Sequence, residues 1–235
     1  MPGTEHKTKK GWGGRRPGAG RPRTKGVTPR IRRPLLASKH PVHVTLSVDD
    51  HLPSLRRPDL LEAIEDCLRE TRMLRKDFRV VHYSIQRHHL HLFVEAKNRT
   101  ALSRGMQSLA IRIAKRINKV LGRRGKVFVD RYFATVVKTA RQARNTIQYV
   151  LLNARRHAAQ SGMRFPPDWI DDCSSGRFFD GWRGLRVRPP PDEEPTVAEA
   201  RTWLASRGWR RLGLIPVDAV PGREGAPGLR GIVPP

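Results

Sequence analysis

Hydrophobic and polar residues alternate along "HPVHVTLSV", residues 40–48, where every second position from Val42 to Val48 is apolar. This period of two predicts a β-strand with one buried face. Residues 78–85 and 88–96 are rich in β-branched and aromatic side chains, and they predict two further strands joined as an antiparallel hairpin. The segment 126–139 predicts a fourth strand.

Three other segments have apolar residues at helical spacing. They are residues 59–77, 98–121 and 140–160, and the last begins after a capping Thr139 and closes at Gly162. The resulting order is β-α-β-β-α-β-α. It predicts an α+β fold of the ferredoxin-like, split βαβ type. We expect an antiparallel sheet of four to five strands with helices on one face, plus an added C-terminal helix.

Composition divides the chain into four predicted parts. Residues 1–34 hold eleven basic residues and one acidic residue among glycines and prolines, so they predict a disordered basic arm. Residues 35–165 form the compact domain. Residues 166–190 are an aromatic extension able to dock on it, and residues 191–235 are a Pro/Gly-rich tail with a short helix near 196–209.

The formal net charge of +26 favours an anionic polymer as partner. The alternative is a solubilising or ribosome-like basic surface. Two cysteines are too few for a disulfide framework. Because no apolar run reaches transmembrane length and the N-terminus lacks a secretory core, we expect a cytoplasmic protein with no membrane partner. Residues 104–126 carry eight basic residues and no acid, which predicts a basic helix face for phosphates or a solvated surface.

Candidate chemistry lies in a histidine pair and in a tyrosine. On a strand, His89 and His91 share one face, about 7 Å apart. We expect this face to be left open, because the apolar face can bury itself under the helices. Two neutral imidazoles there can hold one divalent metal. Taken alone, such a pair is more often two unrelated histidines. In the last predicted helix, Tyr149 points roughly 130° from the core stripe, and Asn153 follows one turn later on the same side. An aromatic at the edge of the core is the alternative.

These residues lie in two recognisable motifs. "HHLHLFVEA" resembles the HUH motif (histidine, hydrophobic, histidine), and "YVLLNARRHA" is similar to the "YIHLNPVRA" segment of single-tyrosine HUH transposases. Over roughly residues 36–162 the chain resembles the REP-associated tyrosine transposases, a branch of the IS200-like family. Two departures stand out. His88 replaces the usual asparagine, which leaves open the choice of histidine pair, and "NARRH" replaces "NPVRA".

The resemblance implies a role for each residue. Tyr149 would be the nucleophile, and His89, His91 and Asn153 would bind Mg²⁺ or Mn²⁺. The activity implied is cleavage and rejoining of single-stranded DNA through a 5′-phosphotyrosine intermediate, in the bacterial cytoplasm or nucleoid. The partner would be single-stranded or hairpin-forming DNA, and the protein a monomer or homodimer.

The basic residues expected to hold DNA come from the arm, the acid-free run and the last helix. They are Arg15, Arg16, Arg21, Arg23, Arg112, Lys115, Arg116, Lys119, Arg123, Arg124, Arg131 and Arg156. Two other functions stay open: a non-catalytic, domesticated DNA-binding protein, and a metal-dependent nuclease in which Tyr149 is structural. A replication initiator or relaxase fits less well, because the chain is compact, lacks a helicase segment and places the histidines before the tyrosine.

Overall fold

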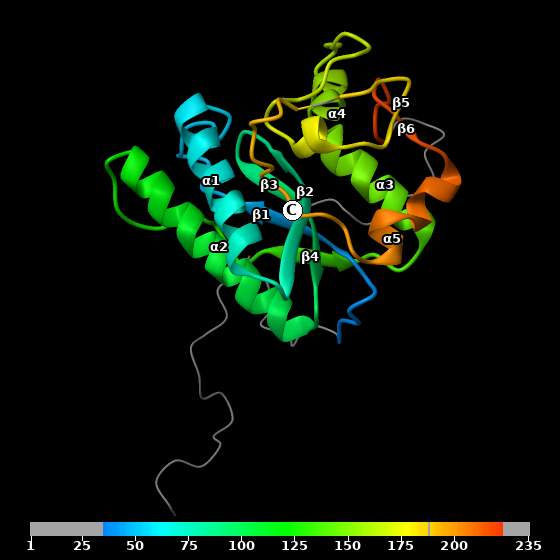
Figure 1. The fold of residues 1–235 in the computed structure, drawn as a ribbon. Helices are drawn as coiled ribbons and strands as arrows, with labels where there is room; N and C mark the ends of the chain where they lie inside the picture. Colours follow the sequence, from blue (N-terminus) through cyan, green and yellow to red (C-terminus); the bar gives the residue numbers. More distant parts are fainter. Residues whose placement is uncertain (1–34, 188, 223–235) are drawn as a thin grey trace, which may run out of the picture. The chain divides into compact units, whose positions relative to one another are not determined.

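The structure is a computed structural model that describes residues 35–187 and 189–222 (Figure 1). Its elements in chain order are β1 (Val42–Ser47), α1 (Pro58–Leu74), β2 (Phe78–Ile85), β3 (His89–Ala96), α2 (Arg99–Val120), β4 (Phe133–Val136), α3 (Ala140–Leu151), α4 (Asn153–Gln160), the 3₁₀ turn η1 (Ser175–Phe178), β5 (Trp182–Arg183), α5 (Trp203–Ser206), η2 (Gly208–Leu212) and β6 (Ile215–Pro216). The predicted basic arm, with its arginines at positions 15, 16, 21 and 23, lies outside the described residues.

Strands β1 to β4 form one antiparallel sheet in the order β2-β3-β1-β4. The two central strands, β1 and β3, are those that begin the two β-α units of the chain. This is the strand order of a split βαβ fold. The predicted fold class is therefore confirmed, with four strands in the sheet, while β5 and β6 pair separately.

Helices α1 and α2 cover one face of the sheet (Figure 1). Strand alternation sends the apolar residues of β1 and β3 to this face, where they meet the hydrophobic stripes of both helices. Side chains with no solvent exposure here include Val42, Val44, Leu60, Ile64, Leu90, Leu92, Leu109, Ile113 and Ile117. Since each such side chain contributes about 1.5 to 3 kcal/mol on burial, this core fixes the register of the sheet.

The opposite face, which carries the histidines, is covered by α3 and by the C-terminal segment, the described residues that follow α4 up to 222. We expected this face to be open, and that expectation is wrong. Phe93 of β3 packs with Ile147 and Val150 of α3, and further out with Trp209, all within one buried cluster. The apolar stripe of α3 needs a partner, and the second face of the sheet is where it finds one.

The predicted helix over residues 140–160 is two helices with a bend at Leu152. The backbone there leaves helical geometry, with φ −106° and ψ 20°. The hydrogen bonds continue across the bend, because the Leu152 amide donates to the Gln148 carbonyl and the Leu152 carbonyl accepts from the Arg156 amide. No proline or glycine marks the position, so the sequence pattern could not reveal it.

The predicted strand over 126–139 and the helix near 196–209 are both shorter than expected. Only residues 133–136 form β4. Before it, the Val129 amide donates to the last carbonyl of β1, and the Val127 carbonyl accepts from a backbone amide that follows β1. At the C-terminus a helix forms only over Trp203–Ser206, followed by η2. Secondary-structure propensity could not predict either result, because at both places the backbone groups bond to other segments of the same chain.

The C-terminal segment binds the edge strand β2. The Ile85 amide donates to the Cys173 carbonyl, and the Ala198 amide donates to the Val80 carbonyl. Arg56 makes a two-pronged ion pair with Asp171, at 2.7 and 3.0 Å. The open edge of the sheet is thereby covered, which removes a site where a foreign strand could pair.

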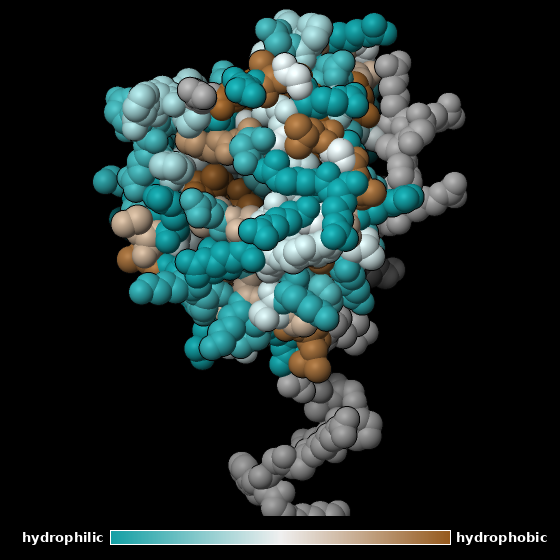
Figure 2. All heavy atoms as spheres, turned by 45° about the vertical axis from the view of Figure 1, so that its right-hand side comes forward, coloured by the Kyte–Doolittle hydropathy of each residue, from teal (hydrophilic) through white to brown (hydrophobic). Residues whose placement is uncertain are grey.

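Hydrophilic residues predominate on the face drawn in Figure 2, and the hydrophobic ones form small separate patches. Over the described part of the chain, no helix combines the length and the apolar character needed to cross a bilayer.

Candidate active site

The pairing of β1 with β3 gathers polar side chains on the face beneath α3. His43 lies opposite Phe93, Thr45 opposite His91 and Ser47 opposite His89. Directly paired residues of antiparallel strands project to the same side, so these side chains share one face. By the same alternation His88 belongs with Leu90 on the other face. Geometry therefore favours His89 and His91 as the pair that acts together.

His91 is buried, with 2% of its surface exposed, and one of its ring nitrogens has two polar neighbours. Its Nδ1 atom lies 3.2 Å from the Thr45 hydroxyl and 3.3 Å from Nε2 of His43. Its Nε2 atom is buried without a hydrogen-bond partner. If the Nδ1 proton is donated to Thr45 or His43, the Nε2 lone pair is left for a ligand.

Tyr149 of α3 packs against these histidines. Its ring meets His91 edge-on at a centroid distance of 5.0 Å, and His43 at 5.6 Å. The side chain is 5% exposed, so the expectation that it projects away from the core is wrong. It is buried because the face that we expected to be open is covered. The Tyr149 hydroxyl accepts a hydrogen bond from Nη1 of Arg156 at 3.2 Å.

Asn153 begins α4, one helical turn after Tyr149. It is completely buried, and neither its Oδ1 nor its Nδ2 atom has a hydrogen-bond partner. A buried amide with both ends unpaired costs free energy unless something binds it. A cation coordinated by the Oδ1 oxygen would supply one of the missing partners.

Burial governs the protonation of the histidines. It lowers the pKa of His43 and of His89 to about 4. It also lowers the pKa of His91 well below its usual value, with His43 as the next cause. All three imidazoles are therefore neutral at pH 7, the form in which histidine ligates metals.

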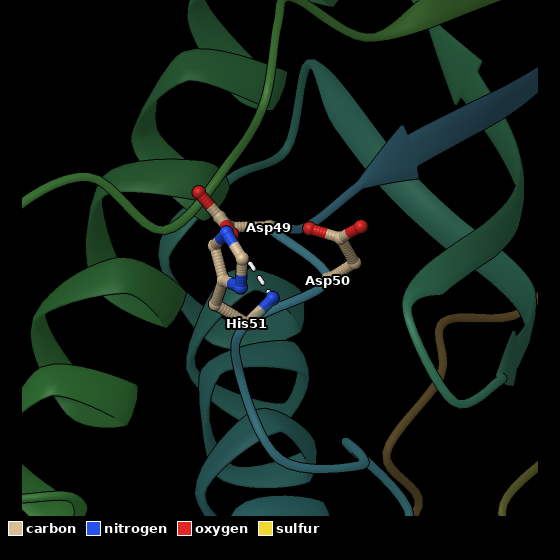
Figure 3. Close-up of side chains that lie close together, drawn as sticks. All are labelled: Asp49, Asp50 and His51. Carbon is tan, nitrogen blue, oxygen red and sulfur yellow. Dashed lines mark hydrogen bonds between the residues drawn. The ribbon is translucent and has the colours of Figure 1, made fainter.

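The free Nε2 of His91 and the unpaired Oδ1 of Asn153 are atoms that can coordinate a divalent cation. The neutral state of the imidazoles also suits such an ion. A different group has its ligand atoms already close together. Among residues 35–187 and 189–222, the His, Cys, Asp and Glu trio whose ligand atoms all lie within 4.8 Å of one another is Asp49, Asp50 and His51 (Figure 3). It lies at the end of β1 and is largely exposed. Exposed carboxylates commonly gather without binding an ion, so this trio by itself indicates no metal site.

The structure does not bring the basic residues of α2 to the tyrosine. Arg116 pairs with Asp66 and Glu70 of α1, and Arg112 donates to Ser108 and Thr71 and pairs with Glu70. Lys115 and Lys119 lie on the same helix, on the far face of the sheet from α3.

The other predicted basic residues of the described chain lie outside α2. Arg123, Arg124 and Arg131 belong to the α2–β4 loop, whose backbone bonds to the end of β1, next to the start of β3. Arg156 reaches the site itself through its hydrogen bond to Tyr149.

Three residues of this site escaped sequence reasoning: His43, Thr45 and His157. His43 and Thr45 occupy the polar positions of the alternating first strand, and that alternation was the available signal. His157 lies two turns beyond Tyr149, and its ring centroid is 5.9 Å from that of His89. Its spacing from Tyr149 would have found it.

The family model described as "Transposase IS200 like" matches residues 37–152, the segment that holds β1 through α3. No curated protein matches the chain. A structure of a REP-associated tyrosine transposase bound to a REP hairpin is 14% identical, with 74% of this chain and 99% of that one covered and a TM-score of 0.48. A bacterial tRNA(His) guanylyltransferase-like protein in complex with GTP is also 14% identical, with 60% and 75% covered and a TM-score of 0.39. At these scores neither likeness adds to the fold described from strand order.

Proposed function

The chain belongs to the IS200-like transposase family, whose model matches residues 37–152, and we propose that it cleaves and rejoins single-stranded DNA. The reaction would proceed through a 5′-phosphotyrosine link to Tyr149. The observation that carries the proposal is the contact of the Tyr149 ring with His91, at 5.0 Å between centroids. A nucleophile and the ligands of a catalytic cation have to meet at one phosphate.

In the proposed reaction, the Oη atom of Tyr149 attacks the phosphorus of one phosphodiester. A bond forms from Oη to phosphorus as the bond from phosphorus to the 3′-oxygen breaks. The phenolic proton passes to solvent, and the departing 3′-oxygen takes up a proton. Because the ester bond is retained on the protein, a 3′-hydroxyl can reverse the step and join strands without ATP.

Arg156 supports the nucleophile in this proposal. It donates from Nη1 to the Tyr149 hydroxyl at 3.2 Å, and its guanidinium carbon lies 5.3 Å from the ring centroid. The hydrogen bond orients the hydroxyl, and the fixed positive charge stabilises the negative charge that develops as the proton leaves. We expected Arg156 to bind DNA phosphate, and its position adds a role at the nucleophile.

His89, His91 and Asn153 would hold the Mg²⁺ or Mn²⁺ ion, which when bound polarises the scissile phosphate as a Lewis acid. Thr45 and His43 fix the orientation of the His91 ring through Nδ1. The buried site also limits water, which competes with DNA for the phosphotyrosine.

DNA would enter beside α4. Tyr149 and His91 are buried, but Arg156 and His89 are partly exposed and His157 is exposed. The rim formed by these three side chains presents ring and guanidinium nitrogens to an approaching phosphate. The positive charge of Arg156 on this rim suits an anionic strand, and single-stranded or hairpin-forming DNA has the freedom to bend into it.

A covalent trapping experiment tests the proposal. A hairpin with a single-stranded flank is labelled at its 3′ end, so that the label lies downstream of the cut. It is incubated with Mn²⁺ and the full chain, and products are resolved under denaturing conditions. We expect a protein–DNA adduct that is lost in Tyr149→Phe.

Two other results would each point to a rival function. Cleavage that survives in Tyr149→Phe would show a nuclease that uses water. Binding without cleavage by the native chain would show a DNA-binding protein.

A further inference from the structure

The tyrosine side of the site is a row of three side chains at four-residue spacing: Tyr149, Asn153 and His157. Residues four apart lie on one face of a helix, and the hydrogen bonds that bridge the bend at Leu152 keep the row continuous. In the family segment "YIHLNPVRA", alanine stands at the position of His157, so this imidazole is a feature of the present chain.

This row lies against the histidine row of β3. Tyr149 meets His91 at 5.0 Å, and His157 meets His89 at 5.9 Å, between ring centroids. The two contacts fix how the rows align. Asn153, halfway along the helix row, therefore comes opposite the space between His89 and His91. Its buried, unpaired amide is explained if that space receives a cation.

The spacing of His89 from each of the other two imidazoles is compatible with a shared ion. Two imidazoles bound to one ion at about 2.1 Å place their ring centroids roughly 4.5 to 6 Å apart. His89 and His91 are 4.7 Å apart and His89 and His157 are 5.9 Å apart. Thr45 lies within hydrogen-bond distance of Nδ1 of His91, which leaves the buried Nε2 of that ring for a ligand.

We propose that His157 is an additional ligand of the cation, so that the site presents three imidazole nitrogens and one amide oxygen. This inference rests on the proposed function, because it takes His89, His91 and Asn153 as the other ligands. The three imidazoles are not drawn together as tightly as Asp49, Asp50 and His51 are. The His157 side chain is exposed, and in this proposal it would turn inward to bind the ion.

A nitrogen-rich site has a consequence for metal choice. Mg²⁺ prefers oxygen ligands and keeps its waters, whereas imidazole suits Mn²⁺, Co²⁺ and Zn²⁺. With two histidines and an amide, Mg²⁺ and Mn²⁺ both remain acceptable. A third imidazole shifts the preference to the transition ions. His157 therefore sets metal selectivity at this site.

Metal binding by the full chain without DNA tests the proposal. Mn²⁺ binding is followed by loss of the free-ion electron paramagnetic resonance signal, and Co²⁺ binding by visible absorption. We expect His157→Ala to weaken Mn²⁺ binding at least about tenfold and to alter the Co²⁺ spectrum, with Mg²⁺ competition becoming stronger. His89→Ala gives the reference for a lost ligand, and His51→Ala removes a histidine from the exposed trio.

Either of two results would overturn the proposal: His157→Ala binding Mn²⁺ like the native chain while His89→Ala does not, or binding lost in His51→Ala and kept in both other variants. Circular dichroism shows whether each variant is folded. The outcome is separable from that of the trapping experiment. Altered Mn²⁺ binding without a DNA adduct would contradict strand cleavage alone, and an adduct with unaltered Mn²⁺ binding would contradict His157 alone.

Discussion

At the scale of single residues, the hydrogen bonds around His91 decide what its ring can do. Thr45 and His43 both reach Nδ1, and the buried Nε2 is left without a partner. A ring held in this way presents one nitrogen in a fixed direction, as second-sphere partners do in metal sites. The polar residues of β1 therefore matter to the site although none of them belongs to the two motifs.

Replacing Thr45 tests this arrangement. Thr45→Val keeps the shape of the side chain but removes the hydroxyl from Nδ1 of His91, so we expect Mn²⁺ binding to weaken by about 10- to 100-fold with the fold retained. Thr45→Ser keeps the hydroxyl and should bind nearly as the native chain does. Equal binding by both variants would show that the hydroxyl has no part in orienting His91.

Arg156 provides a second test at this scale. Arg156→Ala removes the donor to the Tyr149 hydroxyl, and we expect adduct formation to slow by about 100-fold or more, the usual cost of losing a preorganised donor. Arg156→Lys keeps the charge and should lose less. Arg164, an exposed arginine that follows α4, gives a matched control in Arg164→Ala. Similar rates for the two alanine variants would contradict the role given to Arg156.

At the scale of elements, sequence periodicity predicted the first three strands well and the segments after residue 150 poorly. The alternation of residues 42–48 is the alternation of β1, because burying valines on one face leaves little choice of register. The bend at Leu152 and the docking of Trp209 could not be predicted in this way. Both depend on which distant surface a segment packs against, and periodicity carries no record of that.

Arg155 shows how such packing is stabilised. It is 5% exposed, and its guanidinium donates to the carbonyls of Phe165, Pro166, Pro167 and Trp169, at 2.5 to 3.3 Å. No carboxylate shares these bonds. The two terminal nitrogens of the charged group therefore bond to backbone, and they fix the loop that follows α4.

We expect Arg155→Ala to lower the free energy of unfolding by about 2 to 3 kcal/mol, as for loss of charged hydrogen bonds. Proteolysis within residues 163–169 should become faster. Arg164→Ala, which alters the loop's own charge, should change neither by much. A loop equally resistant to protease in Arg155→Ala would contradict the account of its anchoring.

At the scale of the whole molecule, burial of histidines makes stability depend on pH. His82 of β2 is packed between Phe93 and Phe179, with ring centroids at 6.1 and 5.2 Å. Burial lowers its pKa from 6.5 to about 4, against a smaller opposing effect of Asp180. The unfolded chain therefore binds this proton more readily, and stability that is complete above pH 6.5 is lost as pH falls toward 4.

For His82 alone the loss at pH 5 is about 2 kcal/mol relative to neutral pH. Lowered pKa values at His43 and His89, also near 4, act in the same direction. We expect His82→Gln to lose less stability than the native chain between pH 8 and pH 5, as measured by urea unfolding at both. An identical pH dependence in the two proteins would show that His82 is not protonated on unfolding in this range.

Peptide mapping of the trapped adduct tests most directly whether Tyr149 becomes covalently linked to DNA. After reaction with a single-stranded hairpin substrate and Mn²⁺, the DNA is digested and the protein peptides are analysed by mass spectrometry. We expect a nucleotide attached through its 5′-phosphate to the peptide that contains Tyr149, and no such modified peptide from Tyr149→Phe. A phosphotyrosine on Tyr83 or Tyr132, or strand joining with no modified tyrosine at all, would contradict it.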